Sequence, residues 1–415
     1  MFAALAVRNY RIWMAGAFVS NIGTWMQRVA QDWFVLELSH GSGVAVGITT
    51  ALQFLPMLLL SPIGGLVADR FPKRSVLKLT QLWLALMSAL LGVLAVTGVA
   101  QIWQVYVVAF LFGVGTAFDN PARQSFVSEV VGGPLLPNAI ALNSATFNAG
   151  RIIGPALAGL VIAAFGSGWS ILSNSVTYAA FILALVMMDG RLLQPPPRAS
   201  RAKRQIREAL SYVRRQPEIL LVLLIAFSVG TFGMNFQLTS ALMAQQEFHR
   251  GAEQYGILGT FMAVGSLTGA LLAARRTSRP SARFVVVAAT TFGLLEVVSG
   301  LMPTYGWYAA SLPALGLAAL LTMTACNASV QMGAPQLLRG RVMALYMMVM
   351  MGGTPIGAPV IGWIGQTLGP RWTLIGGGAL TVVGVLAAAA WLLPKIYSSP
   401  KACRSLPSSS SERLV

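Results

Sequence analysis

The chain of 415 residues is 56% hydrophobic and only 10% charged, and its formal net charge is +17 at pH 7. Soluble domains carry roughly a quarter charged residues, so this composition excludes an ordinary soluble protein and indicates a membrane protein. The basicity does not predict a nucleic-acid-binding surface. All Lys and Arg except Arg28, Arg151, Arg250 and Arg371 fall in segments that the hydropathy places on one side of a membrane, as expected of cytoplasmic loops.

Apolar runs of the length that crosses a bilayer, about 20 residues, follow one another along the chain. They predict an all-α integral membrane protein with about twelve spans. An even number of spans places both termini on the same side of the membrane, and the basic loops on that side identify it as cytoplasmic. The predicted spans cover residues 11–36, 45–68, 75–98, 102–127, 138–165, 169–188, 218–246, 253–274, 283–302, 306–331, 341–366 and 371–394.

The first predicted span carries several charged and amide side chains. Arg8 and Arg11 precede an apolar run too long for the core of a signal peptide, so we interpret it as a retained helix. Within it, Arg28 and Asp32 lie four residues apart and share a helix face. Charges inside a bilayer are costly and usually functional. Either Asp32 is a proton-titrating acid whose proton Arg28 helps to release, or the two form an ion pair that only specifies packing.

The loop between the second and third predicted spans is rich in charge. Asp69, Arg70, Lys73 and Arg74 follow an apolar run that ends near Gly65. Short loops rich in Lys and Arg stay in the cytoplasm, so this loop sets the direction of every span. Its pattern resembles the G-x-x-x-D-R-x-G-R-K signature of the major facilitator superfamily, with a proline where the second glycine usually stands.

The fifth predicted span carries a second pattern of the same superfamily. Gly150, Gly154, Pro155 and Gly159 resemble the antiporter motif G-x-x-x-G-P-x-x-G-G. Small residues at this spacing admit a neighbouring helix backbone, and the proline permits a bend. The motif is therefore either a pivot for antiport or ordinary close packing.

Two further stretches, 119–126 and 232–237, resemble the corresponding sequences of one branch of the superfamily. This is the drug-efflux branch of drug:proton antiporters, which includes the enterobactin exporters. The resemblance covers nearly the whole chain except the tail. It implies a major facilitator fold, with two pseudo-symmetric six-helix halves around a central cavity. It also implies an inner gate, whose candidate residues are Gly65, Asp69, Arg70, Lys73, Arg74, Asp119 and Arg123.

In that fold the first, fourth, seventh and tenth spans are expected to line the cavity. Apolar walls with a few amides suit an amphipathic ligand. The candidate cavity residues are Asn21, Trp25, Gln27, Gln31, Phe232, Asn235, Phe236, Gln237, Met323, Asn327 and Gln331. Arg151, in the fifth span, is a third candidate for proton coupling beside Asp32 and Arg28, because it can hold an anionic group or a carboxylate. The alternative is a structural donor to carbonyl oxygens.

The two predicted halves resemble each other in sequence. Shifting residues 138–166 by 203 positions onto 341–369 pairs seven identical residues, five of which are Gly or Ala. The domain boundaries that follow are 1–188 for the first half, 218–394 for the second and 395–415 for a disordered cytoplasmic tail. Between the halves, 189–217 is a cytoplasmic linker in which Ile206, Leu210 and Val213 recur at helical spacing. This is either an amphipathic helix at the membrane surface or a solvated linker.

The function that these patterns favour is proton-coupled export of amphipathic small molecules, drug-like or siderophore-like, by alternating access. An importer or uniporter of a small metabolite, a lipid flippase and a membrane protein without a transport cycle remain alternatives. We expect neither enzymatic activity nor a cofactor or metal site, because both histidines, His40 and His249, fall in predicted outer loops and Cys326 has no acid or His nearby. The one-sided distribution of Lys and Arg argues against a nucleic-acid partner. We expect a monomer in the bacterial inner membrane whose partners are its substrate, protons and lipid. Glu296 lacks a cationic neighbour on its own helix and is interpreted as a protonated or interfacially partnered acid.

Overall fold

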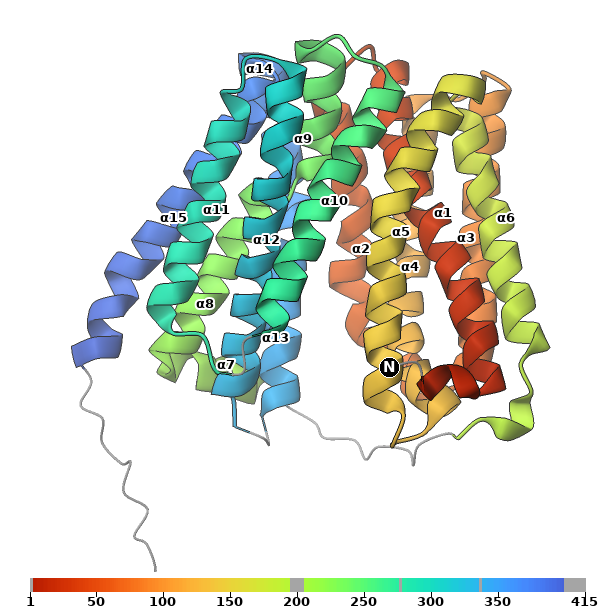
Figure 1. The fold of residues 1–415 in the computed structure, drawn as a ribbon, viewed down its shortest axis with the longest axis horizontal. Coiled ribbons are helices and arrows are strands. Elements are labelled where there is room, and N and C mark those ends of the chain that lie inside the picture. Colours follow the sequence, from red (N-terminus) through yellow and green to blue (C-terminus); the bar gives the residue numbers. More distant parts are fainter. Residues whose placement is uncertain (1–2, 195–204, 276–277, 336–337, 399–415) are drawn as a thin grey trace, which may run out of the picture.

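The computed structural model describes residues 3–194, 205–275, 278–335 and 338–398. Every regular element in these ranges is helical, which agrees with the predicted all-α class (Figure 1). Residues 195–204 of the predicted linker, the side chain of Ile206 and residues 399–415 of the predicted tail lie outside the described part of the chain. Residues 395–398, predicted as the start of a disordered tail, are helical and end α15. The long helices are α1 (Arg8–Leu38), α2 (Gly43–Arg70), α3 (Lys73–Val96), α4 (Ile102–Val131), α5 (Leu136–Phe165), α6 (Ser167–Met187), α10 (Ala252–Ala274), α11 (Ala282–Gly300), α12 (Tyr305–Gly333) and α15 (Arg371–Ser398).

Two of the predicted spans, 218–246 and 341–366, each consist of more than one helical segment. The seventh consists of α8 (Pro217–Ser228), the π-helical turn η3 (Val229–Gly233), α9 (Phe236–Leu242) and the π-helical turn η4 (Met243–Glu247). The eleventh consists of α13 (Arg339–Gly352) and α14 (Thr354–Leu368). Hydropathy does not detect such breaks, because they change the backbone path without changing the polarity of the side chains.

Glycines end several of the helices. Gly132, Gly166 and Gly369 follow α4, α5 and α14 with φ angles of 71°, 89° and 104°. Side chains with a Cβ rarely adopt these left-handed angles, which stop a helix and turn the chain sharply. After each of these turns the next helix runs in the opposite direction to the one before it.

The helices pack in two groups that touch along two seams. Helix α2 packs on α4, α3 on α6, and α1 on α5 and α6, whereas α10 packs on α12 and α11 on α15. In Figure 1, α1–α6 lie to the right and α8–α15 to the left. The seams are α2 against α14 and α5 against α10. Both ends of the described chain lie at the lower end of the molecule in this view.

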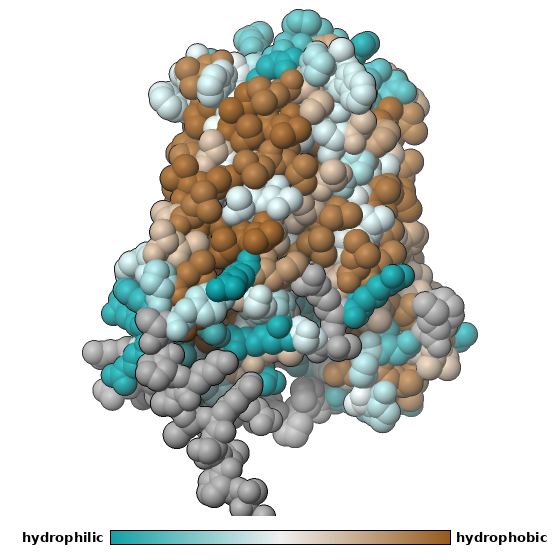
Figure 2. Space-filling view, turned by 60° about the vertical axis from the view of Figure 1, so that its left-hand side comes forward, coloured by the Kyte–Doolittle hydropathy of each residue, from teal (hydrophilic) through white to brown (hydrophobic). Residues whose placement is uncertain are grey.

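Apolar side chains cover much of the outer surface. Leu79, Phe165 and Val176 are 70%, 70% and 67% exposed. Figure 2 shows a hydrophobic band around the middle of the visible face, with hydrophilic side chains gathered toward its two ends. Eleven of the described spans are long and apolar enough to cross a membrane, and the polar helix α1 is not among them. An exposed apolar surface of this extent is stable only in contact with lipid, so the protein is an integral membrane protein.

Candidate functional site

A cavity of about 1160 Å³ lies between the two groups of helices. Its wall includes residues of α1, α4, α9 and α12, as predicted for the first, fourth, seventh and tenth spans, and also residues of α2, α5, α10 and α13. The wall reaches two exposed residues, Ser278 in the connection from α10 to α11 and Gln331 in the last turn of α12. In Figure 1 these ends of α10 and α12 lie at the lower end of the molecule, where the described chain begins and ends. The cavity is therefore accessible from that end.

The opposite end is closed by the seam between α2 and α14. A Cβ atom on Gly43 would lie 2.7 Å from the carbonyl oxygen of Gly362, so the two backbones are in direct contact. The hydroxyl of Ser42 donates a hydrogen bond of 2.8 Å to Oε1 of Gln366. The side-chain amide of Gln246, in the seventh span, donates to the carbonyl of Gly41. Three spans thus meet over the top of the cavity.

Most of the predicted cavity residues lie on its wall. They share a mixture of amide, aromatic and thioether side chains. Those on the wall are Asn21, Trp25, Asn235, Phe236, Gln237, Met323, Asn327 and Gln331.

Gln27, Gln31 and Phe232 are not on the wall, which corrects their prediction. Oε1 of Gln27 accepts hydrogen bonds from Ser88 and Asn174, at 2.5 and 2.6 Å, and so links α1 to α3 and α6. Gln31 donates toward Gln53 of α2 at 3.4 Å, and Phe232 lies in the π-helical turn η3. The helical rotation of about 100° per residue turns Gln27 about 120° from Asn21 and so away from the cavity face. Gln31 is directed instead to α2 by its contact with Gln53.

The wall also carries polar residues that the sequence analysis did not single out. Asn120 and Gln124 of α4 and Ser144 and Asn148 of α5 lie on the cavity. Each pair is four residues apart, and this spacing places polar groups on one face of an otherwise apolar helix. A search for polar pairs at helical spacing within the spans would have found them.

The charged residues on the described wall are mostly cationic. Arg28, Arg123 and Arg151 line the cavity, together with the single acid Asp119. Asp119 is engaged: it accepts hydrogen bonds from Thr80, Gln81 and Arg123. Arg28 belongs to α1, and its guanidinium lies over two aromatic rings, whereas Arg151 belongs to α5. Neither arginine has a hydrogen-bond or ion-pair partner among the described residues. Two arginines are thus available to an anionic group in the cavity.

Asp32 is buried, with 7% of its surface exposed, and is not on the cavity wall. Within the described ranges, neither a hydrogen bond nor an ion pair joins it to Arg28 or to any other residue. Arg28 and Asp32 thus share α1 but do not form the close pair that their spacing suggested. The carboxyl lies within electrostatic range of Arg28 and of Tyr255 on α10.

The predicted gate residues occupy the accessible end of the first six helices. Lys73, at the start of α3, forms a buried ion pair with Glu129 of α4, a partner that the sequence analysis missed. Arg74 donates hydrogen bonds of 2.8 and 2.6 Å to the carbonyls of Leu185 and Met188. These contacts tie α3 to α4 and to the end of α6.

Three further gate candidates lie at the end of α2. Asp69 and Arg70 are exposed. A Cβ atom on Gly65 would meet nothing within 4 Å. In this conformation the last turns of α2 are thus open to solvent at these positions.

The glycine motif of α5 packs this helix between α1 and α10. A Cβ atom on Gly150 would lie 2.9 Å from Cβ of Asn21, and one on Gly154 would lie 2.5 Å from Cβ of Trp25. On the other side, a Cβ on Gly159 would lie 3.0 Å from the carbonyl oxygen of Ala252. The motif residues therefore permit close backbone approach on both faces.

The described part of the chain contains no cluster of three or more His, Cys, Asp or Glu side chains able to hold a metal ion. Cys326 is buried in α12.

The chain matches the transmembrane secretion effector family over residues 1–412. It is 25% identical over 263 residues to the staphyloferrin A transporter of Staphylococcus aureus, covering 63% of this chain and 66% of that protein. It is 27% identical over 369 residues to the multidrug efflux pump Tap of Mycolicibacterium fortuitum, covering 86% and 90% of the two chains. It is 23% identical over 393 residues to the enterobactin exporter EntS of Citrobacter koseri, covering 91% and 90%.

Solved transporters share the fold. A bacterial homologue of the human lysosomal transporter Spinster, in an inward-facing and occupied conformation, superposes with a TM-score of 0.71 at 15% identity, covering 96% of this chain and 98% of that one. A D-xylose–proton symporter gives a TM-score of 0.71 at 11% identity, covering 90% and 96%. The helical fold, the cavity between its two groups of helices and the match along the chain agree, and the protein belongs to the transmembrane secretion effector family of the major facilitator superfamily of transporters.

Proposed function

We propose that the protein exports amphipathic small molecules in exchange for protons, by alternating access. The observation that carries this proposal is the large cavity, accessible from one end and closed at the other by the α2–α14 seam. Its wall combines aromatic and thioether side chains with amides and two unpartnered arginines, which suits a ligand with an apolar body and a polar or anionic group. The named activities of the relatives, siderophore export and multidrug efflux, point the same way.

The architecture that we propose has two pseudo-symmetric six-helix halves, 1–188 and 218–394, with α1 as the first of twelve spans. Equivalent contacts at positions paired by the 203-residue shift support it. Gly159 packs against α10, and its counterpart Gly362 packs against Gly43 of α2. Each half thus uses the same glycine of its fifth helix to contact the second helix of the other half.

The proposed orientation puts both termini and the basic loops in the cytoplasm of a bacterial cell, so the cavity is open inward here. The linker 189–217 includes the helix α7 (Gln205–Arg215), which we propose lies at the inner membrane surface. Val213 of α7 is buried, whereas Leu210 is 40% exposed. Arg214 and Arg215 in its last turn suit anionic lipid head groups.

Asp32 and the arginines of the cavity are the proposed coupling residues. Asp32 would release its proton when the cavity holds substrate and recover one when the outer end opens. Gly65, Asp69 and Arg70 would form the inner gate when the lower ends of the two halves approach. We propose a monomer as the transporting unit, because one chain encloses the whole cavity.

The test is proton movement in everted membrane vesicles that contain the protein. Anilinonaphthalene sulfonate, an anionic amphiphile, and ethidium, a cationic one, are added to acid-loaded vesicles. The proposal expects at least one to discharge the pH gradient with the wild type and not with Asp32→Asn. The exposed Glu253→Gln serves as the matched control. Dye uptake without any pH response would contradict proton coupling. Uptake that only equilibrates the dye would favour a uniporter, and accumulation would favour coupling to another ion.

A further inference from the structure

A second buried acid lies away from the cavity wall, near the end of α11. Glu296 is 0% exposed, and neither carboxyl oxygen has a hydrogen-bond partner. Among acids with described side chains, only Asp32 and Glu296 are buried without a hydrogen bond or an ion pair. Burying a polar group without a hydrogen bond costs folding free energy, so a carboxyl in this position calls for a functional explanation.

The space for the carboxyl is made by two glycines on neighbouring spans. A Cβ atom on Gly233, in η3, would lie 3.2 Å from Oε2 of Glu296. A Cβ atom on Gly377, in α15, would lie 3.4 Å from Oε1. The carboxyl thus lies between the π-helical turn of the seventh span and the last helix.

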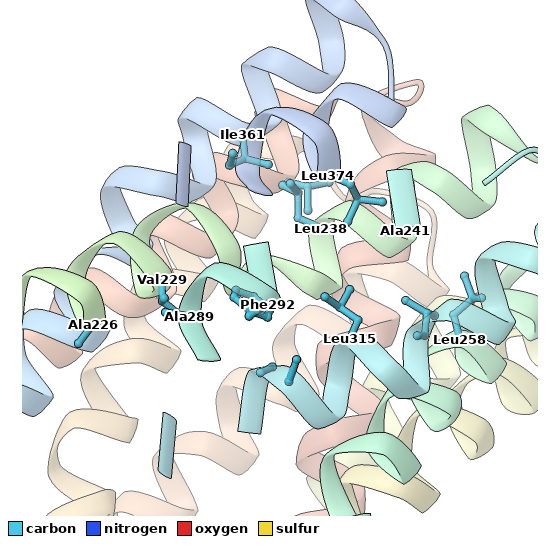
Figure 3. Packing of buried hydrophobic residues seen from close by; sticks show 14 of the residues in the cluster. Ala226, Val229, Leu238, Ala241, Leu258, Ala289, Phe292, Leu315, Ile361 and Leu374 are labelled. Carbon is cyan, nitrogen blue, oxygen red and sulfur yellow. The ribbon is translucent and has the colours of Figure 1, made fainter. Parts of the chain in front are cut away.

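Its surroundings are otherwise apolar. Figure 3 shows Ala289 and Phe292 of α11 beside Val229 of η3. The titratable group in electrostatic range is the hydroxyl of Tyr308 on α12, which shares a hydrogen bond of 3.2 Å with Ser240. No charged side chain faces Glu296 from the described parts of α8, η3, α12 or α15. An ionised carboxylate here would lack any compensating charge from these elements, and this disfavours the ionised form.

The backbone beside Glu296 is the break in the seventh span. Met234 donates to the carbonyl of Val229 at 3.0 Å, which closes the π-helical turn. Asn235 donates to the carbonyl of Thr231 at 2.8 Å. Oδ1 of Asn235 and Oγ1 of Thr231 are themselves buried without partners. Buried polar atoms without partners thus belong to two residues of this break and to Glu296 beside it. Helical turns of the π type are frequent at functional sites.

The break also separates Glu296 from the cavity. Asn235 lies on the cavity wall, whereas Gly233, two residues earlier, faces Glu296. On the remaining side, Gly353 and Gly357 pack against Thr231 without side chains of their own. A small rearrangement of residues 231–235 would open a polar path from the cavity to Glu296.

We propose that Glu296 is a second proton-binding site, and that the break in the seventh span controls its access to the cavity. With the break as it is here, Glu296 holds its proton sealed from water. A substrate that contacts Asn235 shifts the break, water reaches the carboxyl, and the proton leaves through the cavity. This inference rests on the proposed proton-coupled transport. It adds to Asp32 a second residue that binds a proton and names the element that controls access to it.

The first test requires no substrate. Infrared spectra of the purified protein, reconstituted in lipid at neutral pH, are recorded for the wild type, Glu296→Gln, Asp32→Asn and the control Glu253→Gln. We expect the wild type to show the carbonyl band of a protonated carboxylic acid, and we expect Glu296→Gln to lose this band while the other variants keep it. If Asp32 is also protonated, it gives a separate band that only Asp32→Asn loses. In heavy water the band of Glu296 should shift slowly, because its proton exchanges for deuterium only when water reaches it. The shift should be slower still when Ser42→Cys and Gln366→Cys are joined by a short thiol cross-linker across the closed α2–α14 seam. Persistence of the band in Glu296→Gln would overturn the proposal, as would rapid exchange in the cross-linked protein.

The second test measures coupling in vesicles with the dyes used above. Glu296→Gln should bind dye and exchange it between the two sides but should not discharge the pH gradient, whereas Glu296→Asp should retain part of the discharge. Full discharge by Glu296→Gln would overturn the inference while leaving the proposed function intact. Absence of proton movement with the wild type would overturn the proposed function instead, and the heavy-water result would still decide whether Glu296 holds a sealed proton. If Glu296→Gln does not fold, Asn235→Ala provides the second variant, because it should accelerate the exchange of the infrared band.

Discussion

The guanidinium of Arg28 lies over the indole of Trp25, with its central carbon 4.8 Å from the ring centroid. Both residues are on the cavity wall, and the ring of Phe54 lies 5.7 Å from the same carbon. Aromatic faces stabilise a cation without neutralising it. Arg28 therefore keeps its charge available to a ligand while its apolar surroundings hold it in place.

Replacing Arg28 should change the charge preference of the cavity. Arg28→Gln removes a charged donor whose hydrogen bond to an anion is worth about 1.5–3 kcal/mol, so binding of anilinonaphthalene sulfonate should weaken by about tenfold or more. Ethidium binding should stay the same or improve. Fluorescence titration of the purified protein measures both. The control is Arg283→Gln, because Arg283 also lies over an aromatic ring, that of Tyr397, but is not on the cavity wall. An equal loss for both dyes would show that Arg28 acts by shape and not by charge.

The buried Lys73–Glu129 ion pair should affect the free energy of unfolding mainly when one charge is removed and the other is left without its partner. Lys73→Met leaves Glu129 buried and uncompensated, and removal of one partner of a buried pair costs about 3–5 kcal/mol. The double variant Lys73→Met/Glu129→Met should recover most of this loss, because no charge then remains buried. Chemical or thermal unfolding in detergent measures the difference. The exposed pair Arg279–Glu218, at 2.7 Å, is the control, and breaking it should cost at most about 1 kcal/mol.

Gly47 of α2 should be needed to close the upper end of the cavity. A Cβ atom there would lie 2.5 Å from the carbonyl oxygen of Ala358. Gly47→Val should therefore destabilise the closed seam by about 1–3 kcal/mol, which is a shift of about 5–150-fold between two conformations. A cysteine at the cavity residue Thr50, in a cysteine-free background, should then react faster with an impermeant maleimide added outside. Gly340→Val is the control, since a Cβ there meets nothing within 4 Å; equal labelling in both variants would contradict this role of the seam.

Gln27 should act as a structural link between helices. Gln27→Leu leaves the donors of Ser88 and Asn174 without their acceptor, and each buried unsatisfied group costs about 1–3 kcal/mol. The melting temperature should fall, while the affinity for cavity ligands should change little in the protein that remains folded. Asn21→Leu, on the cavity wall, should show the opposite pattern. A loss of affinity without a loss of stability in Gln27→Leu would return this residue to the substrate site.

The positions of the spans could be predicted because they depend on properties of single segments. A run of apolar residues long enough to cross the bilayer must satisfy its backbone internally and becomes a helix wherever it lies in the fold. The glycines of α5 could be predicted as packing positions for a similar reason, since only small residues allow two backbones to approach. Even the end of α14 at Gly369 follows from a local backbone requirement, a φ angle of 104°.

The tertiary structure decided which polar residues meet. Asp32 and Arg28 share a helix face, yet the neighbouring helices place Arg28 on the cavity wall and Asp32 behind it. Gln27 and Asn21 are equally polar in sequence, and the packing of α3 and α6 on α1 separates a structural amide from a ligand-facing one. The break beside Glu296 is likewise invisible in hydropathy. These assignments depend on distances between segments far apart in the chain, and only the assembled helices determine those distances.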